Sequence, residues 1–215
     1  MSAPRDLDHV VVTTPDLAAA VGLVERTTGV APEPGGAHPR FGTRNYLVSF
    51  GGDTYLELLG VDEANTDVTS GRPFGLDDVT TTSVSTWAIH PGDLDAARTR
   101  AADVGIDPGA PYDGSRRTES GELLEWRLTR PVSEPTGIVP FLIDWGSTTS
   151  PAASTAARLE LVSFTASHPE PETYRRVLAA LGTDLEVAAG EPAAPGGAAR
   201  ALGLTVRGPA GELTF

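Results

Sequence analysis

The pattern of apolar and polar positions in the first sixty residues predicts a strand, a helix, a short strand and a hairpin. Residues 7–14 are rich in β-branched side chains, which is typical of a strand. Thr14-Pro15-Asp16 then predicts a helix start, and apolar residues recur at helical spacing as far as Gly29. A Pro- and Gly-rich segment at 31–39 is expected to be a loop, and it leads to a hairpin formed by 45–50 and 54–59.

The same order of elements recurs twice further along the chain. The second copy is predicted to hold a strand at 83–90, a helix at 94–104, a short strand at 111–117 and a hairpin formed by 123–130 and 139–145. The third, looser copy is predicted to hold a strand at 159–165, a helix at 170–181, a short strand at 185–188 and a hairpin within 201–215. The chain is therefore expected to be an α+β protein built from repeated βαβββ modules.

The positions of these copies, and the amino-acid composition of the segments between them, predict the domain organisation. Two paired modules, 5–62 and 82–146, are expected to form one domain over 5–146, followed by a Ser-, Thr-, Ala- and Pro-rich linker at 147–157 and a degenerate third module at 158–215. A second flexible loop is expected at 190–199. Each sheet has one face under its helix and one open face, so two modules bury their open faces together and curve around a cleft, which is the expected ligand site.

Composition and charge exclude several classes of chemistry. The absence of cysteine excludes disulfides, thiolate nucleophiles and cysteine-ligated zinc. All sixteen basic residues are arginine, which excludes a lysine Schiff base. The net charge of -13 argues against nucleic acid or an anionic membrane as a partner. The sequence has no long apolar run and no signal-like start, so we expect a cytoplasmic protein. We also expect it to be a monomer or homodimer whose partner is a small molecule.

Several segments resemble one known superfamily. They are Leu7-Asp8-His9-Val10-Val11-Val12 followed by Pro15-Asp16-Leu17, and Gly52-Asp53-Thr54-Tyr55-Leu56-Glu57-Leu58. This set is similar to the first strand, helix and fourth strand of the vicinal-oxygen-chelate (VOC) superfamily, which includes glyoxalase I, extradiol dioxygenases and the bleomycin- and fosfomycin-resistance proteins. Residues 42–46, 126–128 and 140–145 resemble its glyoxalase-like subgroup. The resemblance implies the glyoxalase/bleomycin resistance/dioxygenase fold, a curved mixed sheet around a cleft.

The resemblance also implies half of a metal site. In metal-dependent members the first strand supplies a His and the fourth a Glu, positions that His9 and Glu57 occupy here. Both suit a divalent ion such as Zn, Ni, Mn or Fe. The second module departs from this pattern, because Thr86 stands opposite His9 and an apolar residue, Leu142 or Ile143, stands opposite Glu57. A metal on His9 and Glu57, or no metal, both stay open.

Without a metal, His9 and Glu57 form either a catalytic acid–base pair or a purely structural one. The remaining candidates for substrate binding are His38, Asn45, Trp126, Arg127, Phe141 and Trp145. Each also has a structural alternative: a solvated loop histidine, a turn cap, a surface charge or a core aromatic. A shift of one residue in strand phase would move the strand residues to the other face.

Three functions are therefore compatible with the sequence. The first is a metal-assisted lyase, isomerase or dioxygenase-type enzyme acting on a small molecule with vicinal oxygens. The second is a non-catalytic protein that binds an antibiotic or a metabolite. The third is a metal-free acid–base enzyme that uses His9 and Glu57.

Overall fold

The computed structural model describes residues 3–118, 121, 123–130, 136–190 and 201–215. The first part holds β1 (Leu7–Thr13), α1 (Leu17–Thr28), β2 (Glu33–His38), β3 (Thr43–Gly51), β4 (Thr54–Val61) and the 3-10 helix η1 (Pro73–Asp78). The second holds β5 (Ser83–Ile89), α2 (Leu94–Asp103), β6 (Tyr112–Arg117), β7 (Leu123–Leu128) and β8 (Phe141–Asp144). After the 3-10 helix η2 (Pro151–Ala153) come β9 (Glu160–His168), α3 (Pro171–Leu181), β10 (Glu186–Ala189), β11 (Leu202–Gly208) and β12 (Gly211–Thr214).

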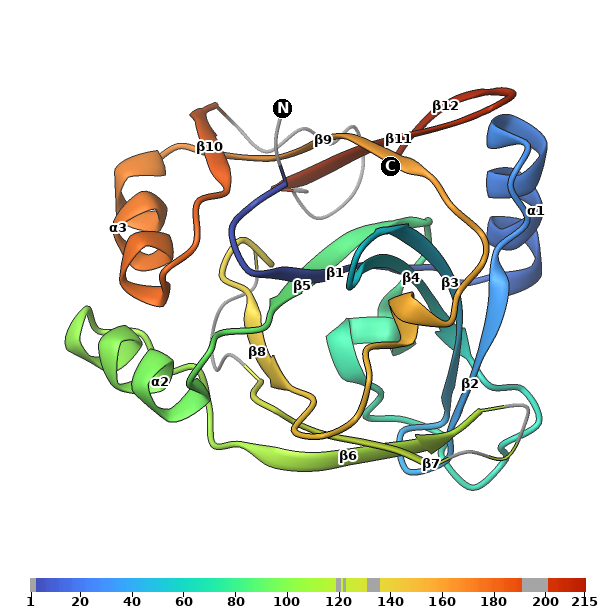
Figure 1. The fold of residues 1–215 in the computed structure, drawn as a ribbon, viewed down its shortest axis with the longest axis horizontal. Helices are drawn as coiled ribbons and strands as arrows, with labels where there is room; N and C mark the ends of the chain where they lie inside the picture. Colours follow the sequence, from blue (N-terminus) through green and yellow to red (C-terminus); the bar gives the residue numbers. More distant parts are fainter. Residues whose placement is uncertain (1–2, 119–120, 122, 131–135, 191–200) are drawn as a thin grey trace.

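The first eight strands close into one barrel, in the order β1-β4-β3-β2-β6-β7-β8-β5 (Figure 1). Each repeat contributes four neighbouring strands, and in each repeat the first strand lies parallel to the last. The two repeats join through the antiparallel pair β1 and β5 on one side. On the other side β2 meets β6, where Ala37 pairs with Arg117. The expected α+β fold with curved sheets is confirmed, and the cleft is the interior of this barrel.

The repeated helix start predicted from sequence is visible in the helix caps. Asp16 accepts a hydrogen bond from the Ala19 amide at 2.9 Å, and Asp93 accepts one from the Ala96 amide at 2.9 Å. These carboxylates satisfy backbone donors that would otherwise lack a partner at the first turn. Gly29 ends α1 in the left-handed conformation, with a φ of 77° that glycine adopts without steric cost.

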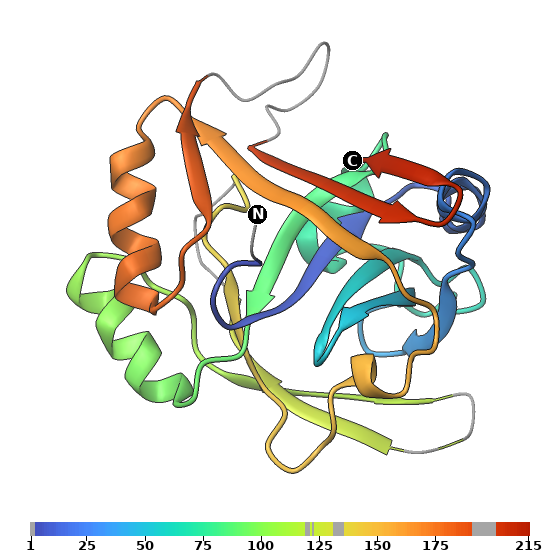
Figure 2. The ribbon, with the colours of Figure 1, turned by 45° about the horizontal axis from the view of Figure 1, so that its top comes forward.

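The third part of the chain forms a separate four-stranded sheet in the order β10-β9-β11-β12. Its elements follow one another as predicted, yet their pairing differs from that of the first two repeats. Here β9 lies parallel to β10, the strand directly after the helix, whereas β1 lies parallel to β4. Figure 2 shows this sheet lying across the barrel on the side of β1 and β5, with α1 at one end and α3 at the other.

Alternation along the strands separates two apolar regions. Val10 and Val12 of β1 face out of the barrel into a large core that also contains Trp87 and Phe164, whose rings meet at 5.5 Å. This core joins the third sheet to the barrel. His9 and Val11 face the barrel interior, where Val11 packs in a second cluster with Phe141 and Trp145, among others. The residues that face inward are therefore the ones available to a ligand.

Two segments expected to be loops are more ordered than predicted. Residues 33–38 form β2, although Pro34, Gly35 and Gly36 disfavour a strand, because the segment pairs with β3 through a bulge at this point. In the predicted linker 147–157, Ala152 is buried against Leu47 and Tyr55, so this segment packs on the barrel. The predicted loop at 190–199 falls, apart from Gly190, outside the described residues. In the described part of the chain, every helix is too short or too polar to cross a membrane.

Candidate functional site

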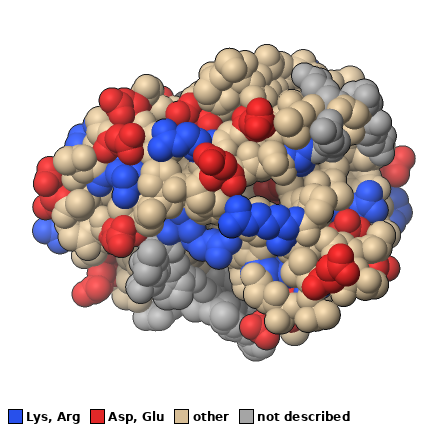
Figure 3. All heavy atoms as spheres, turned by 90° about the horizontal axis from the view of Figure 1, so that it is seen from below, with Lys and Arg blue, Asp and Glu red and all other residues tan. Residues whose placement is uncertain are grey.

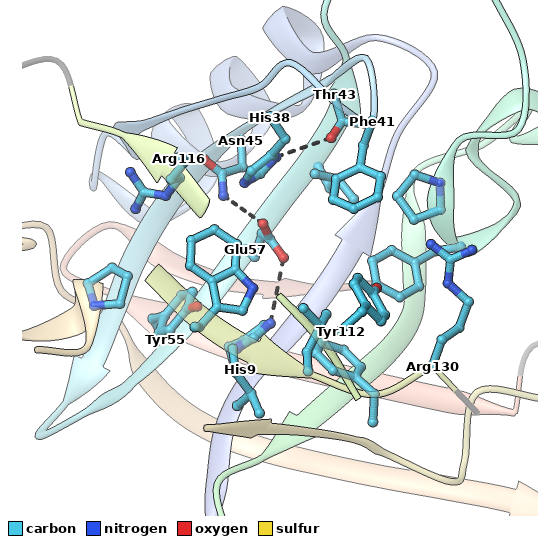
Figure 4. A pocket seen from close by; sticks show the side chains of 18 of the residues that line it. His9, His38, Phe41, Thr43, Asn45, Tyr55, Glu57, Tyr112, Arg116 and Arg130 are labelled. Atoms are coloured by element: carbon cyan, nitrogen blue, oxygen red, sulfur yellow. Dashed lines mark hydrogen bonds and ion pairs between the residues drawn. The ribbon is translucent and has the colours of Figure 1, made fainter. Parts of the chain in front are cut away.

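A pocket inside the barrel receives side chains from both repeats (Figure 4). The volume open to the centres of water molecules is about 80 Å³, which is room for roughly five to eight water molecules. Its lining combines polar and charged side chains with several aromatic rings. The lining residues are His9, His38, Phe41, Thr43, Asn45, Tyr55, Glu57, Leu59, Pro73, Phe74, Tyr112, Arg116, Trp126, Leu128, Arg130, Phe141, Ile143, Trp145 and Pro151.

A carboxylate next to His9 in the chain orients its imidazole. His9 Nδ1 lies 2.6 Å from Asp8 Oδ1, and Trp145 Nε1 donates to Asp8 Oδ2 at 2.8 Å. Consecutive strand residues normally point to opposite faces. Here the pairing of β1 with β5 contains a bulge, since Leu7 is opposite Ile89 and His9 is opposite Ala88. The bulge lets Asp8 and His9 share one side of the strand. An ionised carboxylate only accepts hydrogen bonds, so a neutral His9 would carry its proton on Nδ1 and keep the lone pair on Nε2.

The free nitrogen of His9 faces Glu57. His9 Nε2 lies 3.7 Å from Glu57 Oε2, which is longer than a hydrogen bond. Asn45 Nδ2 donates to Glu57 Oε1 at 2.6 Å and fixes the orientation of the carboxylate. Figure 4 shows Glu57 between Asn45 and His9. The arrangement leaves Nε2 and Oε2, two groups that can exchange protons, side by side at the pocket.

A glycine makes room for Asn45. A Cβ atom on Gly35 would lie 2.2 Å from Asn45 Oδ1, so any other residue there would displace the amide. Asn45 Oδ1 itself is buried and has no hydrogen-bond partner among the residues that the structure describes. This position of the amide therefore depends on the space over Gly35, and through the amide so does the orientation of Glu57.

Aromatic rings enclose His9 on two sides. The Tyr55 ring stacks on the imidazole at 4.6 Å, and the Phe141 ring meets it edge-on at 5.3 Å. Phe74 stacks on Phe141 at 5.6 Å from a left-handed backbone conformation, with a φ of 58°. A bulky residue in that conformation is strained, and such strain is found where the surrounding structure holds a side chain in place. These rings pack against the imidazole and provide flat apolar contacts for a ligand.

Three further titratable groups at the pocket have shifted pKa values. Burial raises the pKa of Tyr55 well above its usual 10.0, with Asp8 and Glu57 adding to the shift, so its hydroxyl stays a neutral donor. Burial lowers the pKa of His38 from 6.5, partly offset by Glu57, and His38 Nδ1 lies 3.1 Å from Thr43 Oγ1. Burial also lowers the pKa of Arg116, while Tyr55 and Glu57 oppose that shift. His38 is thus favoured in its neutral form.

The structure brings most of the residues proposed from sequence into this one pocket. Seven of them line it: His9, His38, Asn45, Glu57, Trp126, Phe141 and Trp145. Arg127 requires a correction, because its side chain is exposed and is not among the described residues that line the pocket. Trp126 faces inward, so strand alternation turns its neighbour Arg127 outward. Figure 3 shows the molecule from below, the side on which β6 and β7 lie, where arginines form a band across the surface.

Three charged residues of the site were missed by sequence reasoning, namely Asp8, Arg116 and Arg130. Asp8 was overlooked because strand alternation places it opposite His9, and nothing in the sequence indicates the bulge that brings the two together. Arg116 lies in a strand that was predicted only as a short one, without a face assigned to it. The available signal for Asp8 was its position as a charged residue in an otherwise apolar strand.

The donor set does not fit a complete divalent-metal site. Among the described residues, no group of three or more His, Asp or Glu side chains is placed to hold an ion. His9 and Glu57 supply two donors, whereas protein zinc sites use three or four. In the second repeat Ile143 faces the pocket, and Thr86 pairs with Val11 on the neighbouring strand. The pocket therefore presents half of a ligand set.

Comparison with known proteins identifies similar sequences and folds. The sequence matches the family described as glyoxalase-like domain over residues 7–182. None of the curated proteins matches it significantly. A hypothetical protein from Staphylococcus aureus superposes with a TM-score of 0.59 at 13% identity, covering 97% of this chain and 84% of that one.

Two enzymes are also among the similar structures. A variant of 4-hydroxymandelate synthase from Streptomyces coelicolor has a TM-score of 0.50 at 16% identity, covering 99% of this chain and 62% of that one. Methylmalonyl-CoA epimerase from Mycobacterium tuberculosis has a TM-score of 0.44 at 19% identity, covering 68% of this chain and 93% of that one. At such low identity, the first of these two enzymes and the S. aureus protein are similar in fold only.

Proposed function

The chain belongs to the glyoxalase-like domain family, and from this premise we propose that it is a metal-independent enzyme that moves a proton on a small organic molecule. His9 is the proposed acid–base group, Asp8 its positioning residue and Glu57 the second proton-exchanging group. The observation that carries the proposal is the chain of contacts from Asp8 to His9 to Glu57 at a pocket lined by several aromatic rings.

Asp8 supports this role by setting the tautomer of His9. With Nδ1–H donated to the carboxylate, the lone pair of Nε2 points away from Asp8 and toward Glu57. Such a nitrogen accepts a proton from an acidic C–H or O–H of a ligand, and the imidazolium that forms is stabilised by the buried carboxylate. The proton then returns to the same atom or to a neighbouring one, so the reaction is an epimerisation or an isomerisation.

Glu57 supports the proposal through its fixed geometry. Asn45 holds one oxygen, and the other lies 3.7 Å from His9 Nε2, so a ligand atom can contact both groups. Two proton-exchanging groups at neighbouring positions allow one to remove a proton while the other delivers one. Aromatic rings pack against His9, and Tyr55 offers a neutral O–H donor for a developing oxyanion.

A second candidate function is binding without turnover. The specific observation in its favour is the predominance of apolar and aromatic side chains in the lining, which suits a sequestered flat ligand. In that case the buried polar groups only orient the ligand. A ligand that raises the unfolding temperature without being chemically changed would support this candidate.

Deuterium exchange tests the proposal without knowledge of the substrate. The protein is incubated in D2O with hydroxyacetone or pyruvate, which carry vicinal oxygens and exchangeable C–H groups, and the loss of the C–H signal is followed by NMR. We expect exchange faster than in buffer, and an about hundredfold loss of the protein-catalysed rate in His9→Gln. The matched control is His90→Gln, because His90 is exposed and is not among the described residues that line the pocket. Equal rates in wild type and His9→Gln would reject proton transfer by His9.

A further inference from the structure

The pocket contains a buried cation that the proposed proton transfer does not use. Arg116 is 5% exposed and donates through Nη1 to the Gly35 carbonyl. Among the residues that the structure describes, no carboxylate lies within ion-pair distance of it, although it keeps its charge at neutral pH. Burying a guanidinium without an anionic partner is costly, and its pKa is lowered by that burial. An anion supplied from outside the chain would remove this cost.

Arg116 lies at the boundary between two hollows. It lines the pocket with His9 and also a second, larger hollow of about 490 Å³ by the same measure. The second hollow is bordered by β2, β6 and the segment around η2, and it carries the hydroxyl groups of Ser150, Ser154 and Thr155. In Figure 4 Arg116 and Tyr55 lie on the same side of the pocket. A ligand that enters the pocket therefore reaches His9 and the guanidinium within one continuous site.

Tyr55 supplies the second donor of this site. Its ring stacks on His9, and its hydroxyl has no hydrogen-bond partner within the described part of the chain. The hydroxyl is close enough to Arg116 for each group to shift the pKa of the other. A guanidinium and a neutral O–H suit the planar oxygens of a carboxylate, which accepts two parallel N–H bonds from arginine.

We propose that Arg116 and Tyr55 form a carboxylate-binding subsite, and that the ligand is a small organic acid whose reactive carbon lies against His9. This inference rests on the proposed function for the role of His9, and the binding subsite itself does not. The overall charge of -13 repels an acid in bulk solution, so a buried arginine is the feature that would select one. The size of the pocket limits the acid to a few carbon atoms or one ring.

The test uses two probes of nearly the same shape and different charge. Binding of 4-fluorobenzoate and of 4-fluorobenzamide is measured by fluorine NMR titration of the full chain. We expect the acid to bind wild type about tenfold more tightly than the amide. Arg116→Met should weaken the acid about tenfold or more and leave the amide unchanged. The matched control is Arg127→Met, which removes an exposed arginine from the adjacent strand and should change neither affinity.

Several results would overturn the subsite. One is equal affinity of wild type for the two probes, and another is no binding of the acid at millimolar concentration. A third is an equal loss of affinity for both probes in Arg116→Met. If Arg116→Met fails to fold, two other measurements decide: the preference of wild type for the acid over the amide, and the affinity of Arg116→Lys for the acid. Lysine keeps the positive charge but cannot make the two-pronged contact. His9→Gln separates the two proposals. If this variant still binds the acid but loses deuterium exchange, both proposals are supported. If it still binds the acid and its exchange is undiminished, proton transfer by His9 is rejected and the carboxylate subsite stands.

Discussion

Asp8 and His9 are consecutive residues of β1, yet their side chains hydrogen-bond to each other on the same side of the strand, with 2.6 Å between Oδ1 and Nδ1. The bulge between β1 and β5 makes this contact possible. Trp145 occupies the other oxygen of Asp8, so the carboxylate is held on both sides. In a neutral His9 this contact would place the proton on Nδ1 and leave Nε2 free.

Asp8→Asn should slow proton transfer without removing His9. An amide can present its NH2 group to Nδ1, which favours the tautomer with the proton on Nε2 and removes the accepting lone pair. We expect the deuterium-exchange rate to fall about tenfold to a hundredfold. The change in tautomer is measured separately by ¹⁵N NMR of the imidazole, which a merely structural effect on folding would not alter. An unchanged rate and tautomer would show that Asp8 does not orient His9.

Gly35→Ala should disturb the site through Asn45. The new Cβ would lie 2.2 Å from Asn45 Oδ1, so the amide must move away and the hydrogen bond to Glu57 must lengthen. We expect a loss of about 1–3 kcal/mol in the free energy of unfolding, measured by urea denaturation. Gly92→Ala is the control, because a Cβ there meets no atom within 4 Å and its φ is not positive. Similar losses in both variants would contradict the steric argument.

The folded state should lose stability as the pH falls, partly through His38. Its pKa is lowered in the folded protein, chiefly by burial and also by Arg116, while Glu57 and Asp62 act in the opposite direction. Between this lowered pKa and the usual 6.5, the unfolded chain binds more protons than the folded one. The contribution of His38 is therefore fully present above pH 6.5 and is lost as the pH falls through that window.

The measurement for His38 is urea denaturation of wild type and His38→Gln between about pH 5 and pH 7.5. The stability of wild type relative to the variant should rise with pH and level off above the usual pKa of histidine. Glutamine cannot titrate, and the other groups are common to both proteins. A relative stability that stays flat, or that falls as the pH rises, would contradict a lowered pKa.

Divalent metals should bind weakly. His9 and Glu57 provide two donors, and the second repeat places Ile143 in the pocket where a further ligand would be needed. In calorimetric titrations with Zn, Ni, Mn or Fe, we expect no stoichiometric binding that depends on His9 and Glu57. The variants His9→Ala and Glu57→Gln test that dependence. Tight binding of one ion, lost in both variants, would restore the metal-assisted function that the sequence leaves open.

The sequence predicts the local elements well, because they depend on periodicity and caps. Alternation along a strand puts His9 with Val11, and Tyr55 with Glu57, on shared faces, and the structure has them there. It could not fix the phase of β7, so Arg127 was proposed for the pocket although it faces outward. A short strand was expected between the first helix and the hairpin, but residues 31–39 were predicted to be a loop because the Pro-Gly-Gly sequence has low strand propensity. In the structure, pairing with β3 makes 33–38 the strand β2.

Features that depend on contacts between distant segments could not be predicted. The bulge that turns Asp8 toward His9 depends on the register between β1 and β5, which are joined by more than sixty residues. The strand order of the third sheet is likewise set by which strands meet, since its element order is the same as in the first two repeats. Arg116 becomes notable only when its burial without an anionic partner is seen.

The tautomer of His9 tests the central claim most directly. The ring nitrogens of His9 are assigned by ¹⁵N NMR from the signals that disappear in His9→Gln, and their shifts are measured near neutral pH. The structure predicts a protonated Nδ1, donated to Asp8, and an unprotonated Nε2 that faces Glu57. A proton on Nε2, or an imidazolium held permanently between the two carboxylates, would leave no lone pair for a ligand and would contradict the proposed role of His9.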